Sequence, residues 1–277
     1  MNPTPDLSVI VPMHNAAAHI ETLVRSIVQI ESLDVECIVV DDASTDDSRS
    51  VLERLDAELD ALAVVHLDEN VGAGVARNTG FERARGRYTL FFDADDILHP
   101  DALVAAIESL DRTNASMAML PYRYRRGVLA AHEEMNEYDV EVWDQVTAGR
   151  SVSTVLLSDV PALLGFSNYP WNKVLRTEHY RRSGLRFSAT PVHNDILGHW
   201  HSLLFADTID LVDEPLCTHI VTTSGNHLSN RESRDRLALF DALDDTYDLL
   251  CSRPDLVSRY THHFWSLSVR IGRWARS

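Results

Sequence analysis

The chain has 277 residues, 45% of them hydrophobic, which is enough to form one large domain with a substantial core. Its formal net charge of −17 at pH 7 argues against nucleic acid and anionic lipid as main partners. The same charge would repel a nucleoside diphosphate, so a site for one would need a cation. The three cysteines form no CxxC pair, and no signal peptide or apolar run of the ~18 residues that span a membrane is present, so we expect a soluble, cytoplasmic protein.

The first 120 residues alternate between short apolar runs and stretches with apolar residues at helical spacing. The expected strands are 7–11, 36–40, 62–67, 88–92 and 115–120, and the expected helices are 20–30, 45–59, 71–84 and 100–110. The apolar runs are continuous, as in strands that are buried on both sides. This pattern predicts an α/β fold with a Rossmann-like, mostly parallel sheet and helices on both faces.

After Pro121 the regular alternation ends, because 122–126 is basic and aromatic while 132–144 is acidic and irregular. The later pattern predicts short helices at 151–157, 177–183 and 194–205, a strand at 209–212, and helices at 233–250 and from 254 to the end. The last helix carries Arg270, Arg273 and Arg276 at helical spacing. It could lie on a membrane surface, pack on the domain or form a dimer seam.

Polar residues follow the expected strands at 12–15, 41–44, 68–72 and 93–96. In an open parallel sheet, ligands bind at the carboxyl ends of the strands, where these loops would lie. The strongest single signal is the last loop, Asp93-Ala94-Asp95-Asp96, whose D-x-D spacing brings carboxylates together. Such oxygen ligands suit Mg²⁺ or Mn²⁺, which could bridge to a diphosphate.

Each of these loops also has a purely structural interpretation. Asp95 and Asp96 could cap the helix that starts near Pro100. Asp42 could accept the ring N–H of a base such as uracil, or it could belong to a capping box of the next helix. Arg77, on the helix after a glycine-bearing turn, could reach a phosphate or base, or it could lie on a solvated helix face.

Taken together, SVIVPMHN, VECIVVDDASTDDS and LDENVGAGVARNTGFERARGRYTLFFDADD resemble the family 2 glycosyltransferases with a GT-A fold. The resemblance covers residues 8–96 almost continuously. It implies an inverting transfer from a nucleoside-diphosphate sugar, with UDP as the default nucleotide and Mn²⁺ or Mg²⁺ as cofactor. It also implies a donor-binding half at 1–121, an acceptor-side half of the same domain at 122–232, and a helical annex at 233–277.

The resemblance assigns roles residue by residue. The nucleotide-sugar site would comprise Pro12, His14, Asn15, Asp42, Gly74, Arg77, Asp93 and Ala94. Asp95 would be a metal ligand, and a late histidine, His219 or His227, could complete the metal site or simply be a surface or packed residue. The family usually has an aromatic residue where this chain has His14.

The second half resembles the family less closely. Pro170-Trp171-Asn172-Lys173 is similar to the family's W-N-K segment and, with Asn194, would lie on the acceptor side. Trp171 could stack on a sugar or pack in the core. Asp195 would be the catalytic base by resemblance, although it could also cap the following helix.

The identity of the acceptor stays open: a glycan, a lipid-linked sugar, a protein or a small molecule would all be compatible. A nucleotidyltransferase is disfavoured because VPMHNAAAH has no glycine, lysine or arginine after the first strand. A dehydrogenase is disfavoured because no G-x-G-x-x-G follows that strand. Asn194, where the family usually has Glu, and His14 leave room for a binding protein that has lost turnover.

Overall fold

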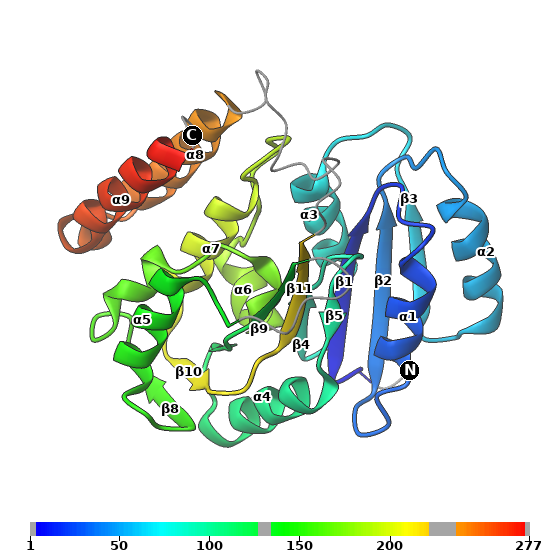
Figure 1. Cartoon of the computed structure of the whole chain (residues 1–277), viewed down its shortest axis with the longest axis horizontal. Helices are drawn as coiled ribbons and strands as arrows, with labels where there is room; N and C mark the ends of the chain where they lie inside the picture. Colours follow the sequence, from blue (N-terminus) through cyan, green and yellow to red (C-terminus); the bar gives the residue numbers. More distant parts are fainter. Residues whose placement is uncertain (1–3, 127–133, 222–236, 275–277) are drawn as a thin grey trace.

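The computed structural model describes residues 4–126, 134–221 and 237–274. Within these ranges an eight-stranded sheet has the order β3-β2-β1-β4-β9-β6-β10-β8 (Figure 1). Its strands are β1 Leu7–Met13, β2 Val35–Asp41, β3 Leu62–His66, β4 Tyr88–Phe91, β6 Met117–Met119, β8 Val152–Val155, β9 Lys173–Arg176 and β10 Ile209–Val212. Strands β1 to β4 are parallel to one another, and β6 is parallel to β10. Strand β9 pairs antiparallel with both β4 and β6, and β8 pairs antiparallel with β10. The predicted mostly parallel sheet is therefore confirmed.

The first half of the chain, up to residue 121, follows the predicted alternation. Its helices are α1 Ile20–Val28, α2 Ser48–Glu58, α3 Ala73–Arg83 and α4 Pro100–Thr113. Every residue of β1 and β2 is buried, so both faces of the sheet are covered there. Helix α1 buries an apolar stripe and contacts α2 and β2, while α3 packs on β1 and β2. The four helices predicted in this half are confirmed, with ends that differ by a few residues.

The second half of the chain, from residue 122 onward, differs more from the expectation. The segment 151–157, predicted as a helix, contains strand β8, whose residues alternate in burial along the antiparallel edge of the sheet. The acidic segment expected to be irregular contains helix α5 (Glu137–Thr147), capped by Asn136, whose side chain accepts the Asp139 backbone N–H. Helices α6 (Thr177–Ser183) and α7 (Asp195–Leu204) and strand β10 are confirmed.

A second, three-stranded sheet was not predicted. Within the described part of the chain it has the order β5-β11-β7, with β5 at Ile97–Leu98, β7 at Arg123–Arg126 and β11 at Cys217–Val221. Strand β5 follows the D-x-D loop directly, and β11 pairs with it antiparallel. The small sheet therefore brings a late segment of the chain beside that loop.

The C-terminal annex is a pair of helices, α8 (Ala238–Cys251) and α9 (Pro254–Trp274), at one end of the molecule (Figure 1). Helix α8 contacts α7, and α9 contacts the 3₁₀ helix η1 (Pro161–Gly165). Arg270 donates a hydrogen bond to the Gly165 carbonyl and lies over the Tyr138 ring. This contact favours the alternative in which the basic residues of the last helix pack on the domain. Arg276, the third of these residues, lies outside the described residues. No helix in the described ranges combines the length and the apolar character needed to cross a bilayer.

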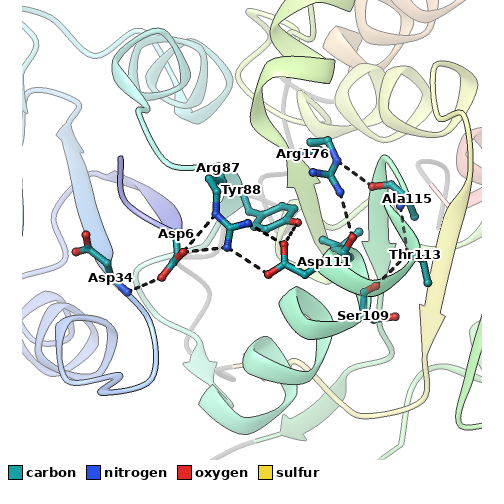
Figure 2. Close-up of polar contacts among 10 residues, drawn as sticks. Asp6, Asp34, Arg87, Tyr88, Ser109, Asp111, Thr113, Ala115 and Arg176 are labelled. Atoms are coloured by element: carbon teal, nitrogen blue, oxygen red, sulfur yellow. Dashed lines mark hydrogen bonds and ion pairs between the residues drawn. The ribbon is translucent and has the colours of Figure 1, made fainter. Parts of the chain in front are cut away.

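A network of charged residues lies at the amino edge of the sheet, where β1 and β4 begin (Figure 2). Arg87 donates hydrogen bonds to both Asp6 and Asp111, and the Tyr88 hydroxyl also donates to Asp111, at 2.7 Å. Nearby, Arg176 at the end of antiparallel β9 donates to the carbonyl groups of residues 110 and 115. The polar loops singled out in the sequence lie at the opposite edge.

Candidate active site

The loop after β1 is fixed to the loop after β2. Pro12 lies within β1, paired with β2, and His14 Nδ1 lies 2.8 Å from the Asp42 carbonyl oxygen. Asn15 has a left-handed backbone with φ 54°, and its Oδ1 accepts the backbone N–H of Thr45 at 2.8 Å. The exposed side chains of His14 and Asn15 therefore lie at the carboxyl edge in a defined arrangement.

Asp42 joins the β2 loop to the start of α3. Its carboxylate is buried, and its two oxygens accept the backbone N–H groups of Val71 at 2.7 Å and Gly72 at 2.8 Å. The predicted capping of the next helix by Asp42 is wrong, because α2 begins after Asp47. Because Asp42 is buried and both of its oxygens already accept main-chain N–H groups, its contact with a base stays a prediction.

Helix α3 approaches the segment before α7 very closely. A Cβ atom on Gly74 would lie 2.0 Å from the Ser188 carbonyl oxygen and 2.8 Å from Asn194 Cβ. No side chain fits at that distance, so Gly74 is required for this contact. The structure thereby gives Gly74 a packing role in addition to the predicted one at the nucleotide.

Arg77 is buried and connects two parts of the predicted site. It donates a hydrogen bond to Asp93 Oδ1 at 2.6 Å and another to Asn194 Oδ1 at 2.7 Å, and it lies over the Phe187 ring. The alternative in which Arg77 lies on a solvated helix face is therefore wrong. Its guanidinium group spans from the D-x-D loop to the residue that precedes Asp195.

The D-x-D loop presents side chains of different exposure. Asp93 and Ala94 are half-buried, Asp95 is exposed and Asp96 is buried. The capping alternative for the two later aspartates is wrong, because α4 begins after His99 and has no side-chain cap. The Asp95 carboxylate instead lies at the mouth of the loop.

Asp96 anchors this loop to β11. Its Oδ1 accepts hydrogen bonds from His219 Nδ1 at 2.8 Å and from the Ile220 backbone N–H at 2.9 Å. Its Oδ2 is buried and has no hydrogen-bond partner among the described residues. Burial raises the pKa of Asp96 to about 6, against the opposing effect of His219. The sequence pattern singled out Asp93 and Asp95, the two aspartates of the D-x-D, but it is Asp96 that anchors the loop to β11.

His219 lies beside the loop, in contact with Asp96, and its role as a metal ligand stays a prediction. Burial acts to lower the pKa of His219, but the hydrogen bond and charge of Asp96 outweigh it, and the net shift is upward. His227 lies outside the described residues. Among those described, no three His, Cys, Asp or Glu side chains are gathered as a ready-made metal site.

The residues present nevertheless fit a divalent cation whose coordination is completed by a bound phosphate group and water. Mg²⁺ is commonly held by one or two carboxylates, with substrate phosphates and water completing its coordination. The exposed carboxylate of Asp95 and the unpartnered Oδ2 of Asp96 are hard oxygen donors in the same short loop. His219 supplies an imidazole beside them.

Asp195 is the first residue of α7 and is half-buried. The N-cap is Asn194 and makes no side-chain capping bond, so the capping alternative for Asp195 is wrong. Burial raises the pKa of Asp195, and the positive charges of Arg77 and His193 partly oppose that shift. A raised pKa suits a carboxylate that must accept a proton.

The W-N-K segment is buried. Trp171 is fully buried and stacks on Tyr169 with ring centroids 4.4 Å apart, so the structure favours the packing alternative. Asn172 is equally buried, and Lys173 Nζ donates to its Oδ1 at 2.5 Å and to the Tyr169 carbonyl at 2.9 Å. Burial lowers the pKa of Lys173 to about 7. All three side chains are buried, so direct contact between them and an acceptor is disfavoured, and an acceptor-side role stays a prediction.

Two tyrosines near the site were missed. The Tyr169 and Tyr124 hydroxyl oxygens lie 2.9 Å apart, and both rings lie within 6 Å of His219. The basic, aromatic segment at 122–126 was the available signal for Tyr124. Nothing in the sequence indicated that this segment would meet Tyr169, because the two are brought together only by the pairing of β7 with β11 and by burial of Trp171.

Comparison with known proteins identifies the family of the chain. The model of the family described as "Glycosyl transferase family 2" matches residues 8–164, more than half of the chain. TuaG of Bacillus subtilis, named for teichuronic acid biosynthesis, is 39% identical over 118 residues, which are 43% of this chain and 47% of TuaG. The uncharacterized glycosyltransferase YibD of Escherichia coli is 30% identical over 207 residues, 71% of this chain and 56% of YibD. The chain thus spans about half the length of these two relatives.

Solved structures show the same fold. Residues 1–349 of TarS from S. aureus, in complex with UDP-GlcNAc, superpose with a TM-score of 0.69 at 22% identity over 87% of this chain and 66% of that one. The mannosyltransferase PcManGT from Pyrobaculum calidifontis, in complex with GDP-Man and Mn²⁺, gives 0.63 at 19% identity over 99% of this chain and 72% of that one. With the GT-A fold shown and the family model matched over more than half of its length, the chain belongs to glycosyl transferase family 2.

Proposed function

We propose that the chain transfers a sugar from a nucleoside-diphosphate sugar to an acceptor with inversion at the anomeric carbon. The observation that carries this proposal is the placement of Arg77, whose guanidinium joins Asp93 in the D-x-D loop to Asn194 beside Asp195. The buried guanidinium of Arg77 thereby lies between the proposed donor-binding loop and Asp195, a carboxylate suited to accept a proton.

The donor would bind across the carboxyl edge of the sheet. Asp42 would accept a hydrogen bond from the base, the His14–Asn15 loop would line the nucleoside, and Asp93 would lie on the ribose side. We propose UDP as the nucleotide, because the TarS complex contains UDP-GlcNAc, although the PcManGT complex contains GDP-Man. UDP is therefore the first nucleotide to test.

The cation would be held by Asp95, with His219 as the second candidate ligand. When bound, Mn²⁺ or Mg²⁺ neutralises the negative charge that develops on the leaving diphosphate. The neighbouring Asp96 keeps the loop attached to β11, which holds the two candidate ligands beside each other.

Asp195 would act as the general base. It takes the proton of the acceptor hydroxyl while the acceptor oxygen forms a bond to the anomeric carbon and the bond from that carbon to the diphosphate oxygen breaks. Attack opposite the leaving group inverts the anomeric configuration. Proton removal by a positioned carboxylate contributes roughly 10²–10⁴-fold to the rate.

We propose the cytoplasm as the site of the reaction, with the acceptor being a glycan, a lipid-linked sugar, a protein or a small molecule. A lipid-linked acceptor would place the protein at the inner face of a membrane. Trp265 and Val269, both exposed on α9, are the apolar side chains that could contact the membrane surface.

A thermal-shift panel of nucleotides and nucleotide sugars, with and without Mn²⁺, tests the donor site. We expect the largest stabilisation from UDP or a UDP-sugar together with the metal, since a ligand that binds only the folded state raises its stability. Slow, metal-dependent hydrolysis of the stabilising sugar nucleotide then tests turnover. Stabilisation without hydrolysis would favour the binding-protein alternative, and no stabilisation by any nucleotide would contradict the proposal.

A further inference from the structure

Arg77 has one charged partner and one neutral partner. Asp93 accepts one of its N–H groups at 2.6 Å, and the amide oxygen of Asn194 accepts another at 2.7 Å. We propose that Asn194 is a positioning residue for the proposed reaction: it holds Arg77 beside Asp195 and, being neutral, leaves the guanidinium charge to act on the Asp195 carboxylate. The inference rests on the proposed function for the role of Asp195 as base.

The orientation of the Asn194 side chain is fixed by its surroundings. Its side-chain Nδ2 donates to the Thr190 carbonyl oxygen at 3.3 Å, and the backbone carbonyl of Asn194 accepts the Ser188 backbone N–H at 3.1 Å, which fixes the main chain at this residue. A guanidinium has donors only, so the amide must present its oxygen to Arg77. Gly74 allows α3 to pack directly on Asn194, since a Cβ atom at position 74 would lie 2.8 Å from Asn194 Cβ.

Charged and titratable groups approach Asp195 from several packed elements. They are Arg77 from α3, Asp93 from the loop after β4, His193 from the turn before α7, Lys173 from β9, and Tyr169 just before β9. Burial and Asp93 disfavour the ionised Asp195, whereas Arg77 and His193 favour it. A carboxylate in place of the Asn194 amide would add a like charge and attract the guanidinium away, and both effects would raise the pKa of Asp195 further.

The substitution Asn194→Asp tests this idea with little change in shape. It keeps an oxygen toward Arg77, removes the donor to the Thr190 carbonyl and adds one negative charge. Asn78→Asp is a matched control, because Asn78 Nδ2 donates to the Phe187 carbonyl at 3.0 Å and its Oδ1 accepts the Phe187 N–H at 2.8 Å. Both variants therefore lose one donor at the junction of α3 with the segment before α7, and both gain one charge.

The first readout is the pH dependence of metal-dependent donor hydrolysis. We expect Asn194→Asp to move the acidic limb of the profile upward by about one pH unit or more, with the rate recovering at higher pH. Asn78→Asp is expected to lower the melting temperature by a similar amount and to leave the limb in place. The proposal is overturned if the acidic limb of the pH profile lies at the wild-type position in both variants, or if both variants shift it equally.

The second readout does not depend on turnover. Carboxyl ¹³C NMR titration, with the Asp195 signal assigned by Asp195→Asn, is expected to show the same upward shift in Asn194→Asp only. If the wild type hydrolyses no donor, the proposed function fails while this titration still decides the inference. Should Asn194→Asp not fold, Asn194→Ala removes the anchor of Arg77 without adding charge; the Asp195 titration is then expected to move upward, and an unchanged titration overturns the proposal.

Discussion

The two edges of the central sheet carry charge in opposite ways. At the amino edge, Asp6 and Asp111 share Arg87, whose hydrogen bond is the main cause that lowers the pKa of Asp111 (Figure 2). At the carboxyl edge, burial raises the pKa values of Asp96 and Asp195. The two carboxylates of the amino edge share an arginine, whereas Asp96 and Asp195 at the carboxyl edge ionise less readily than a free carboxyl group.

This difference separates stability from function. A carboxyl whose pKa is lowered by folding adds stability above its unfolded pKa, and that stability is lost as the pH falls through its folded pKa. A carboxyl whose pKa is raised has the reverse effect, because the folded protein binds the proton more tightly and stability falls as the pH rises toward the folded value. The amino edge thus stabilises the free protein near neutral pH, whereas, under the proposed function, a bound cation would stabilise the ionised carboxylates of the carboxyl edge.

Asp195→Asn should have the largest effect. It removes the proposed base while keeping the size of the side chain, so transfer or donor hydrolysis should fall by roughly 10²–10⁴-fold. Affinity for the donor, measured by calorimetry with Mn²⁺, should stay nearly unchanged. Loss of donor binding with intact chemistry would contradict the assignment of Asp195 as base.

Asp95→Ala should remove most of the stabilisation that a metal and nucleotide provide together. At a ligand concentration of about 100 times Kd, that stabilisation is about 2.7 kcal/mol, and it is read as a shift in melting temperature. The matched change at the other edge, Asp111→Ala, should leave the ligand-induced shift intact while lowering the melting temperature of the free protein. If Asp95→Ala and Asp111→Ala showed equal ligand-induced shifts in melting temperature, the proposed division into a stabilising edge and a ligand-binding edge would be contradicted.

Lys173 offers a direct view of the carboxyl edge, because it is the only lysine in the chain. Protein labelled with [¹⁵N]lysine should give one Nζ signal that titrates at about 7, the pKa to which burial lowers this group. Between pH 7 and the ordinary lysine pKa of 10.5, the unfolded chain binds a proton that the folded state lacks, so this group makes stability rise with pH across that window. Lys173→Met should abolish that rise in urea unfolding, and titration of the Nζ signal at its ordinary value would contradict the expectation.

Arg87→Ala should have the smallest effect. The residues it pairs with are substantially exposed, so the loss of unfolding free energy should be about 1 kcal/mol and should shrink in high salt. Donor hydrolysis should be unchanged. Arg83→Ala, which removes only a bond to the Thr79 carbonyl, is the control and should cost less.

The first half of the fold could be predicted because its signals are local. Continuous apolar runs mark the buried strands, and each intervening helix has its own apolar stripe. Strand β9 had no such signal: its four residues lie between β4 and β6 only because antiparallel pairing with both places them there. Strand β8 is similarly defined by its partner β10, so a short polar-alternating segment was mistaken for a helix.

The candidate site shows the same division. The D-x-D loop and Arg77 were recognisable as parts of one motif, but the partner of Arg77 lies 117 positions later, at Asn194. Whether Trp171 faced a sugar or the core depended on Tyr122 and Tyr169, whose rings surround it only after folding. Residue type and spacing indicated the chemistry of these positions, and tertiary contacts decided their exposure.

The close contact at Gly74 limits how this enzyme scaffold can change. A single methyl group at that position would meet a backbone carbonyl, which cannot rotate aside as a side chain could. Gly74→Ala would therefore push α3 away from the start of α7 and increase the distance between Arg77 and Asn194. The distance between α3 and the segment before α7 is thus set by main-chain atoms at this position rather than by a side chain that could repack.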